Sequence, residues 1–223
     1  MGEVRFDQER YDEAYNFFQK VLTIYEQYSP SCHVDIVFSL MTMGHIKYKV
    51  RKFDEALDYY HRGVNILKEF DPTDHTQIAH GLEWIGSLWS EKQSYDRSIE
   101  YYEQCLRVRE VSLSPTHLSI VDALLRLGKA QRIRHQYEHS LTYELKSFLI
   151  REQVLPPNHQ DIGKILANIG ECYEHLNQCK VALDYYKRAL IVYEQCLPSE
   201  HQERWVIEFK IEQLSEETEQ IDI

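Results

Sequence analysis

The chain has 223 residues, of which 43% are hydrophobic, so it is long enough to bury a sizeable core. Its formal net charge of −11 argues against nucleic acid or an anionic membrane as a partner, because binding phosphates needs an excess of lysine and arginine. No apolar run approaches the roughly 20 residues of a membrane span. The five cysteines have no framework spacing, which is typical of reduced thiols, and we therefore expect a cytoplasmic protein.

An internal repeat of 42 residues runs along the chain without an insertion or deletion, and positions 42 residues apart are called a column here. One column holds His33, His75, His117, His159 and His201, and another holds Gly2, Gly44, Gly86, Gly128 and Gly170. A third holds Leu40, Leu82, Leu124 and Leu166, a fourth Tyr11, Phe53, Tyr95 and Tyr137, and a fifth the small residues Ala14, Ala56, Ser98, Ser140 and Ala182. A fixed period of this size predicts a solenoid, in which each unit buries its apolar face against its neighbours.

The columns divide the chain into one array of units. We expect residues 1–32 to form a partial first helix pair, because the chain opens at a column glycine. Four full units follow, at residues 33–74, 75–116, 117–158 and 159–200. Residues 201–223 are predicted to form a capping helix. In that helix we expect Trp205, Phe209 and Leu214 to pack on the preceding unit, and Glu208, Glu212, Glu216, Glu217 and Glu219 to face solvent.

Each full unit is predicted to consist of two helices. In residues 75–116 an apolar stripe from Ile78 to Leu88 has helical spacing and ends before Gln93. A second helix is expected from near Tyr95 to Ser112. Prolines mark the junctions between units, at Pro30, Pro72, Pro115, Pro156, Pro157 and Pro198. We expect the glycine and small columns to allow close approach of two helices, and the column histidines to hydrogen-bond helix starts.

The column spacing resembles the tetratricopeptide signature. Examples are Leu40 to Gly44 followed by Phe53-Asp54-Glu55-Ala56 and Tyr59-Tyr60, and Leu166 to Gly170 followed by Ala182 and Tyr185-Tyr186. The 42-residue period, the junction Pro72-Thr73-Asp74-His75 and helix ends such as Ile150-Arg151-Glu152 resemble the kinesin light chain type. The resemblance implies an all-α fold, a right-handed superhelical solenoid of antiparallel helix pairs, and a protein that binds other proteins or peptides.

No catalytic or metal site is predicted. The chain has no glycine-rich phosphate loop, no Gly-x-Ser-x-Gly elbow and no His-Glu-x-x-His pair, so we expect neither an enzyme nor a cofactor. Cys172, His175 and Cys179 lie on one predicted helix face and have residue types that zinc binds. A fourth ligand is missing, however, and both cysteines occupy columns of buried apolar residues, so a structural role is favoured.

The remaining expected function is recognition in a concave groove lined by the first helix of each pair. Residues 117–158 carry six lysines and arginines against four acidic residues, which makes this the net-positive full unit of an acidic chain. We predict that Arg126, Lys129, Arg132 and Lys164 bind the charges of an acidic ligand, and that Phe38, Tyr48 and Trp84 bind its aromatic or apolar anchor. Arg126 is also spaced to pair with Asp122 on the helix surface, which is the alternative interpretation of this charge.

Asn168 stands in the sequence Leu166-Ala167-Asn168-Ile169, which matches a Leu-x-Asn-Leu/Ile pattern of kinesin light chains. That resemblance implies that Asn168 holds the backbone of an extended peptide. We therefore expect a scaffold module that binds a protein or peptide, and self-association is a second expected interaction. The alternative is a structural or regulatory repeat domain of a larger protein whose activity lies elsewhere.

Overall fold

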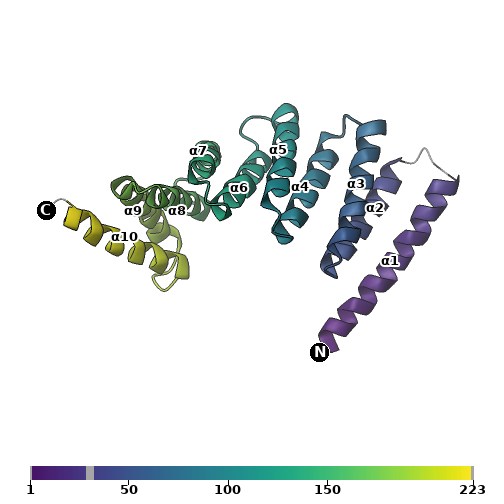
Figure 1. Cartoon of the computed structure of the whole chain (residues 1–223), viewed down its shortest axis with the longest axis horizontal. Coiled ribbons are helices and arrows are strands. Elements are labelled where there is room, and N and C mark those ends of the chain that lie inside the picture. Colours follow the sequence, from purple (N-terminus) through teal and green to yellow (C-terminus); the bar gives the residue numbers. More distant parts are fainter. Residues whose placement is uncertain (1, 29–32, 222–223) are drawn as a thin grey trace. The chain divides into compact units, whose positions relative to one another are not determined.

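The computed structural model describes residues 2–28 and 33–221 of the chain, with side chains for residues 10–27 and 33–218. These residues are almost entirely helical, which confirms the predicted all-α class (Figure 1). The helices are α1 (Gly2–Tyr28), α2 (His33–Lys49), α3 (Phe53–Phe70), α4 (His75–Glu91), α5 (Tyr95–Ser112), α6 (Leu118–Ile133), α7 (Tyr137–Val154), α8 (Gln160–His175), α9 (Cys179–Cys196) and α10 (Gln202–Ile221). The predicted break at Pro30 lies outside the described residues.

The chain forms two compact units, residues 1–112 and residues 113–223. In the first unit α2 packs on α3 and α4 on α5, while α1 packs on α2 and α3 on α4. In the second unit α6 packs on α7 and α8 on α9, while α7 packs on α8 and α9 on α10. Consecutive helices therefore form antiparallel pairs, as the columns predict, and each pair packs on its neighbour within the unit (Figure 1).

The first helix of each full pair ends in the same way. Arg51, Gln93, His135 and Asn177, which are 42 residues apart, have positive φ angles of 58–60°. The amide after each of them donates to a carbonyl five residues earlier, for example Lys52 N to Lys47 O at 2.9 Å. This is the Schellman arrangement, which satisfies the last carbonyls of a helix and turns the chain back. Arg51, Gln93 and His135 adopt it without being glycine.

The glycine column lies where the two helices of a pair meet. A Cβ atom on Gly86 would lie 2.7 Å from the ring of Tyr102, and one on Gly44 would lie 2.8 Å from the ring of Tyr60. In the small column, the Ser98 hydroxyl donates to the carbonyl oxygen of Gly86 at 2.8 Å. The predicted close approach of helices at these columns is therefore confirmed.

Three histidines of the first column hydrogen-bond helix starts, as predicted, whereas His75 does not cap α4. The Nδ1 atoms of His117, His159 and His201 accept hydrogen bonds of 3.1, 3.2 and 3.3 Å from the amide two residues later. At the start of α4 the capping group is the side chain of Asp74, which accepts from the Gln77 amide. Each cap satisfies one of the amides that a helix leaves unpaired at its first turn.

The capping helix α10 corrects one prediction. Leu214 is buried at 3% exposure, but Trp205 and Phe209 are 64% and 47% exposed and do not pack on the preceding unit as expected. The physical reason is helical periodicity, because residues 205 and 214 lie about half a turn apart on the helix surface. The stripe that packs on α9 instead contains Ile207, Ile211 and Leu214.

Candidate ligand-binding surface

The outer face of α6 carries two exposed cations. Arg126 and Lys129 are exposed, while Leu124, Leu127 and Gly128 on the opposite face are buried. Among the residues whose side chains are described, Lys129 has no ion-pair partner within 4 Å. This face of α6 thus exposes two positive charges, together with the negative charge of Asp122.

Two further predicted site residues, Lys164 and Asn168, lie on helix α8. Lys164 is exposed and lies 3.4 Å from the carboxylate of Glu203 on α10. Asn168 is half-buried, and its Nδ2 atom donates to Glu144 Oε1 at 3.4 Å. The side chain of Asn168 is therefore oriented by a contact from α7.

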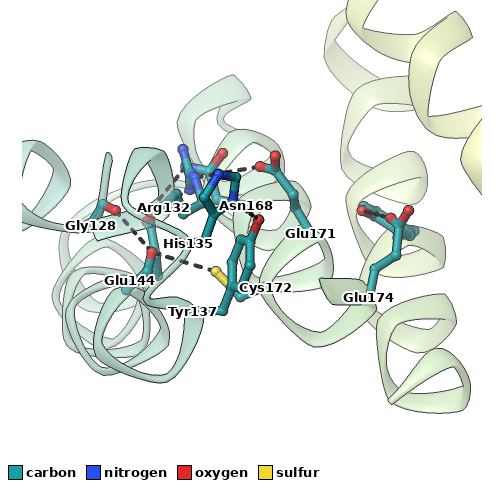
Figure 2. Close-up of polar contacts among 11 residues, drawn as sticks. Gly128, Arg132, His135, Tyr137, Glu144, Asn168, Glu171, Cys172 and Glu174 are labelled. Carbon is teal, nitrogen blue, oxygen red and sulfur yellow. Dashed lines mark hydrogen bonds and ion pairs between the residues drawn. The ribbon is translucent and has the colours of Figure 1, made fainter. Parts of the chain in front are cut away.

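Arg132 is the predicted cation with a different environment. Its guanidinium Nη1 lies 2.6 Å from Glu144 Oε1, and its Nε lies 3.5 Å from Glu171 Oε2, so the side chain bridges two carboxylates (Figure 2). The Arg132 side chain is 17% exposed and that of Glu144 is 0% exposed. The positive charge of Arg132 is thus largely compensated inside the protein, unlike that of Lys129.

Glu144 occupies a column that holds tyrosine in the other full pairs, namely Tyr60, Tyr102 and Tyr186. Each of these buried tyrosines lies on the column glycine and directs its hydroxyl to the first helix of its pair. The Tyr102 hydroxyl donates to Ser87 Oγ at 3.2 Å, and the Tyr186 hydroxyl donates to Glu174 at 2.6 Å. The Glu144 side chain lies against Gly128, where the other pairs have a tyrosine ring. Because glutamate is shorter than tyrosine, the Arg132 guanidinium points inward and contacts the Glu144 carboxylate.

The electrostatics of Glu144 follow from this burial. Burial raises the pKa of its carboxyl to about 7, although Arg132, the Asn168 amide and Arg151 favour the ionised form, and Glu171 opposes it. Glu144 Oε1 accepts from Arg132 and Asn168, whereas the buried Oε2 has no hydrogen-bond partner among the described residues. A buried carboxylate oxygen without a donor disfavours the charged form, so Glu144 gains and loses its proton near neutral pH.

In the first unit, two of the three predicted anchor residues lie together. Trp84 on α4 is 37% exposed, and its ring centroid lies 6.3 Å from that of Tyr48 on α2. His45 packs edge-on against Trp84 at 4.4 Å, and Tyr60 stacks on Trp84 at 6.2 Å. Burial, together with the nearby charge of Lys49, lowers the pKa of His45, so this aromatic cluster is uncharged at neutral pH.

Phe38, the third predicted anchor residue, has other neighbours. It is 63% exposed and packs edge-on against Phe18 of α1, with ring centroids 6.0 Å apart. No ring contact joins Phe38 to Tyr48 or Trp84 among the described side chains. The predicted anchor thus divides into the cluster around Trp84 and a separate exposed ring.

The residues considered for zinc have other contacts. Cys172 is buried, and its thiol donates to Ser140 Oγ at 3.5 Å, while burial raises the pKa of that thiol. His175 stacks on Tyr137 with ring centroids 4.3 Å apart. Within the described part of the chain, no three histidine, cysteine, aspartate or glutamate residues are grouped to hold a metal ion. No helix of that part is long and apolar enough to cross a membrane.

Comparison with known proteins agrees with this architecture. Family models described as tetratricopeptide repeat match residues 1–69, 79–111 and 121–161. No curated protein is a significant match to the sequence.

Solved structures are similar in fold. BtubC (BKLC) from P. vanneervenii is 12% identical with a TM-score of 0.73, and the match covers 94% of this chain and 82% of that one. A putative kinesin light chain with nearly identical TPR-like repeats from Podosopora anserina is 15% identical with a TM-score of 0.68, covering 82% and 87% of the two chains. The apo form of RapI is 17% identical with a TM-score of 0.77, covering 92% of this chain and 55% of that one.

The matched repeats and the helix pairs define a tetratricopeptide solenoid, a fold that is typically a non-enzymatic scaffold for protein–protein interaction. The chain belongs to the tetratricopeptide repeat proteins, and its repeats have the fold of the kinesin light chain type.

The main site residue that sequence reasoning missed is Glu144. Its signal was present in the sequence, because among the full pairs it is the one departure from the column that contains Tyr60, Tyr102 and Tyr186. Sequence reasoning also missed Arg109, because arginine is rarely buried. The Arg109 side chain is 4% exposed and forms an ion pair with Glu83 of α4.

Proposed function

We propose that the chain is a scaffold whose second unit binds an acidic segment of a partner protein. The observation that carries this proposal is the exposed positive face of α6, with Arg126 and Lys129, in a chain of net charge −11. An exposed cation on such a surface attracts carboxylates or phosphates and increases the rate at which a negatively charged partner associates.

The neighbouring side chains of α8 support the same ligand chemistry. Lys164 extends the positive surface, and the Oδ1 atom of Asn168 is an acceptor for a backbone amide, while its Nδ2 is oriented by Glu144. A side chain that is already ordered loses less conformational entropy when a ligand binds, which favours recognition of an extended peptide at this position.

Exposed ion pairs alone contribute only about 0–1 kcal/mol each, so a ligand of useful affinity also needs an apolar contact. The first unit has a separate candidate surface for an aromatic or apolar side chain, at the partly exposed Trp84 and Tyr48, and Phe38 is a further exposed ring. Aromatic residues of this kind often dominate the energy of protein interfaces.

The experiment is a titration with a fluorescein-labelled peptide that has one tryptophan flanked by aspartates and glutamates. The double variant Arg126→Glu, Lys129→Glu should weaken binding by at least about tenfold, because two attractive contacts become repulsive. Binding to the wild type should also weaken as salt rises, since exposed charges are screened over about 8–10 Å.

The matched control is Lys146→Glu with Lys187→Glu, which makes the same change in net charge on the exposed faces of α7 and α9. If the two double variants lose affinity equally, the effect is one of net charge and the α6 surface is not the site. If neither loses affinity, the proposal of an electrostatic site fails.

A further inference from the structure

The Glu144 carboxyl and its contacts are the feature of the second unit that the proposed binding surface does not explain. A helix pair of this fold is stable with tyrosine at this position, since three of the four full pairs have it. Glutamate instead places a buried carboxylate directly beneath Arg132 and Asn168, which are two of the residues predicted to contact the ligand. Stability alone therefore does not account for Glu144.

We propose that Glu144 is a positioning residue that controls whether Arg132 is available to an acidic ligand, so that ligand binding is coupled to the uptake of one proton by Glu144. This inference rests on the proposed function. With Glu144 ionised, Arg132 is held inward by Glu144 and Glu171, and a ligand carboxylate must compete with both (Figure 2).

Protonation of Glu144 removes one of the two negative charges that hold Arg132. The remaining partner, Glu171, lies at 3.5 Å from Nε and is 46% exposed, so this contact is solvent-screened and weak. The guanidinium of Arg132 can then turn toward a ligand carboxylate, and the proton that neutralises Glu144 comes from the solution. Ligand binding and proton binding are thermodynamically linked. An acidic ligand that binds the protonated form better must therefore raise the pKa of Glu144.

The groups that surround Glu144 allow this exchange near neutral pH. Arg132 of α6 and Arg151 of its own helix α7 favour the ionised carboxylate, and Glu171 of α8 disfavours it. Cys172 of α8 also faces this region, but burial raises the pKa of its thiol and keeps it neutral. Burial of Glu144 outweighs the two arginines, so its pKa of about 7 places the exchange in the physiological range.

The test is to titrate the full chain with the same acidic peptide between pH 6 and pH 8, for the wild type and for Glu144→Gln. One proton with a pKa of about 7 predicts that wild-type affinity falls by about tenfold over this range. Glu144→Gln resembles the protonated side chain, so its affinity at pH 8 should match that of the wild type at pH 6. Every other titratable residue of the chain remains in the variant, so the difference between the two proteins isolates Glu144.

A weaker affinity of Glu144→Gln at both pH values would overturn the inference, because Glu144 would then only hold the surface in shape. Equal pH dependence in the two proteins would also overturn it. Glu138→Gln, an exposed carboxylate on the same helix, is the matched control and should behave as the wild type does.

A ligand-free measurement separates this inference from the proposed function. The ¹⁵N resonance of the Arg132 guanidinium should shift across pH 6–8 in the wild type and stay constant in Glu144→Gln. If the peptide binds neither protein but this shift occurs, the acidic ligand is wrong and the release of Arg132 is upheld. An Arg132 resonance that does not respond to pH overturns the inference whatever the peptide does.

Discussion

Replacing Glu144 with glutamine should change how the stability of the protein depends on pH. The pKa of Glu144 is raised by burial from 4.5 to about 7, so the folded state holds this proton more tightly than the unfolded chain does. The stabilising contribution of the protonated carboxyl is complete below pH 4.5 and is lost as the pH rises through 7. The stability of the wild type relative to Glu144→Gln should therefore fall by roughly 2–3 kcal/mol between pH 5 and pH 8.

The assay is urea unfolding of both proteins at pH 5 and pH 8, followed by far-ultraviolet circular dichroism. Glu138→Gln, which removes an exposed carboxylate from the same helix, should show the same difference from the wild type at both pH values. If the difference between wild type and Glu144→Gln is also the same at both pH values, Glu144 is not a buried carboxyl with a raised pKa, and the electrostatic reasoning is refuted.

Two predictions concern packing. Gly86→Leu should destabilise the first unit by several kcal/mol, because a Cβ atom there already lies 2.7 Å from the Tyr102 ring, and an unchanged melting temperature would refute the close approach of α4 and α5. In α10, Leu214→Ala should lower the free energy of unfolding by about 2–5 kcal/mol, and Trp205→Ala should lower it much less, because only the leucine is buried. Urea unfolding measures both, and the reverse order would show that α10 packs through its other face.

The columns predicted the fold well because each one reports a contact that every pair repeats. The glycine column identified the helix contacts at Gly44 and Gly86, and the histidine column identified the helix starts at His117 and His159. The prediction for α10 was wrong about Trp205 because α10 lies where the columns fade, so no repeated contact constrained which face packs.

The candidate site was only partly predictable. Exposed positions such as Lys129 follow from their place in the repeat, and the structure leaves them exposed as expected. The state of Arg132 could not be inferred in the same way, because it depends on a carboxylate from α7 that reaches it across the helix pair. Such a contact belongs to one pair alone, and the sequence signals it only as a missing tyrosine in the column of Tyr102 and Tyr186.

The most direct test of the central claim is to map the bound acidic peptide on the second unit by NMR. The account predicts that backbone and side-chain resonances on the first helices of the pairs change most, at Arg126 and Lys129 of α6 and at Asn168 of α8. The resonances of Lys146 on α7 and Lys187 on α9 should remain unchanged. Changes confined to α7 and α9, with those of α6 and α8 unaffected, would contradict the claim that this positive surface binds the partner.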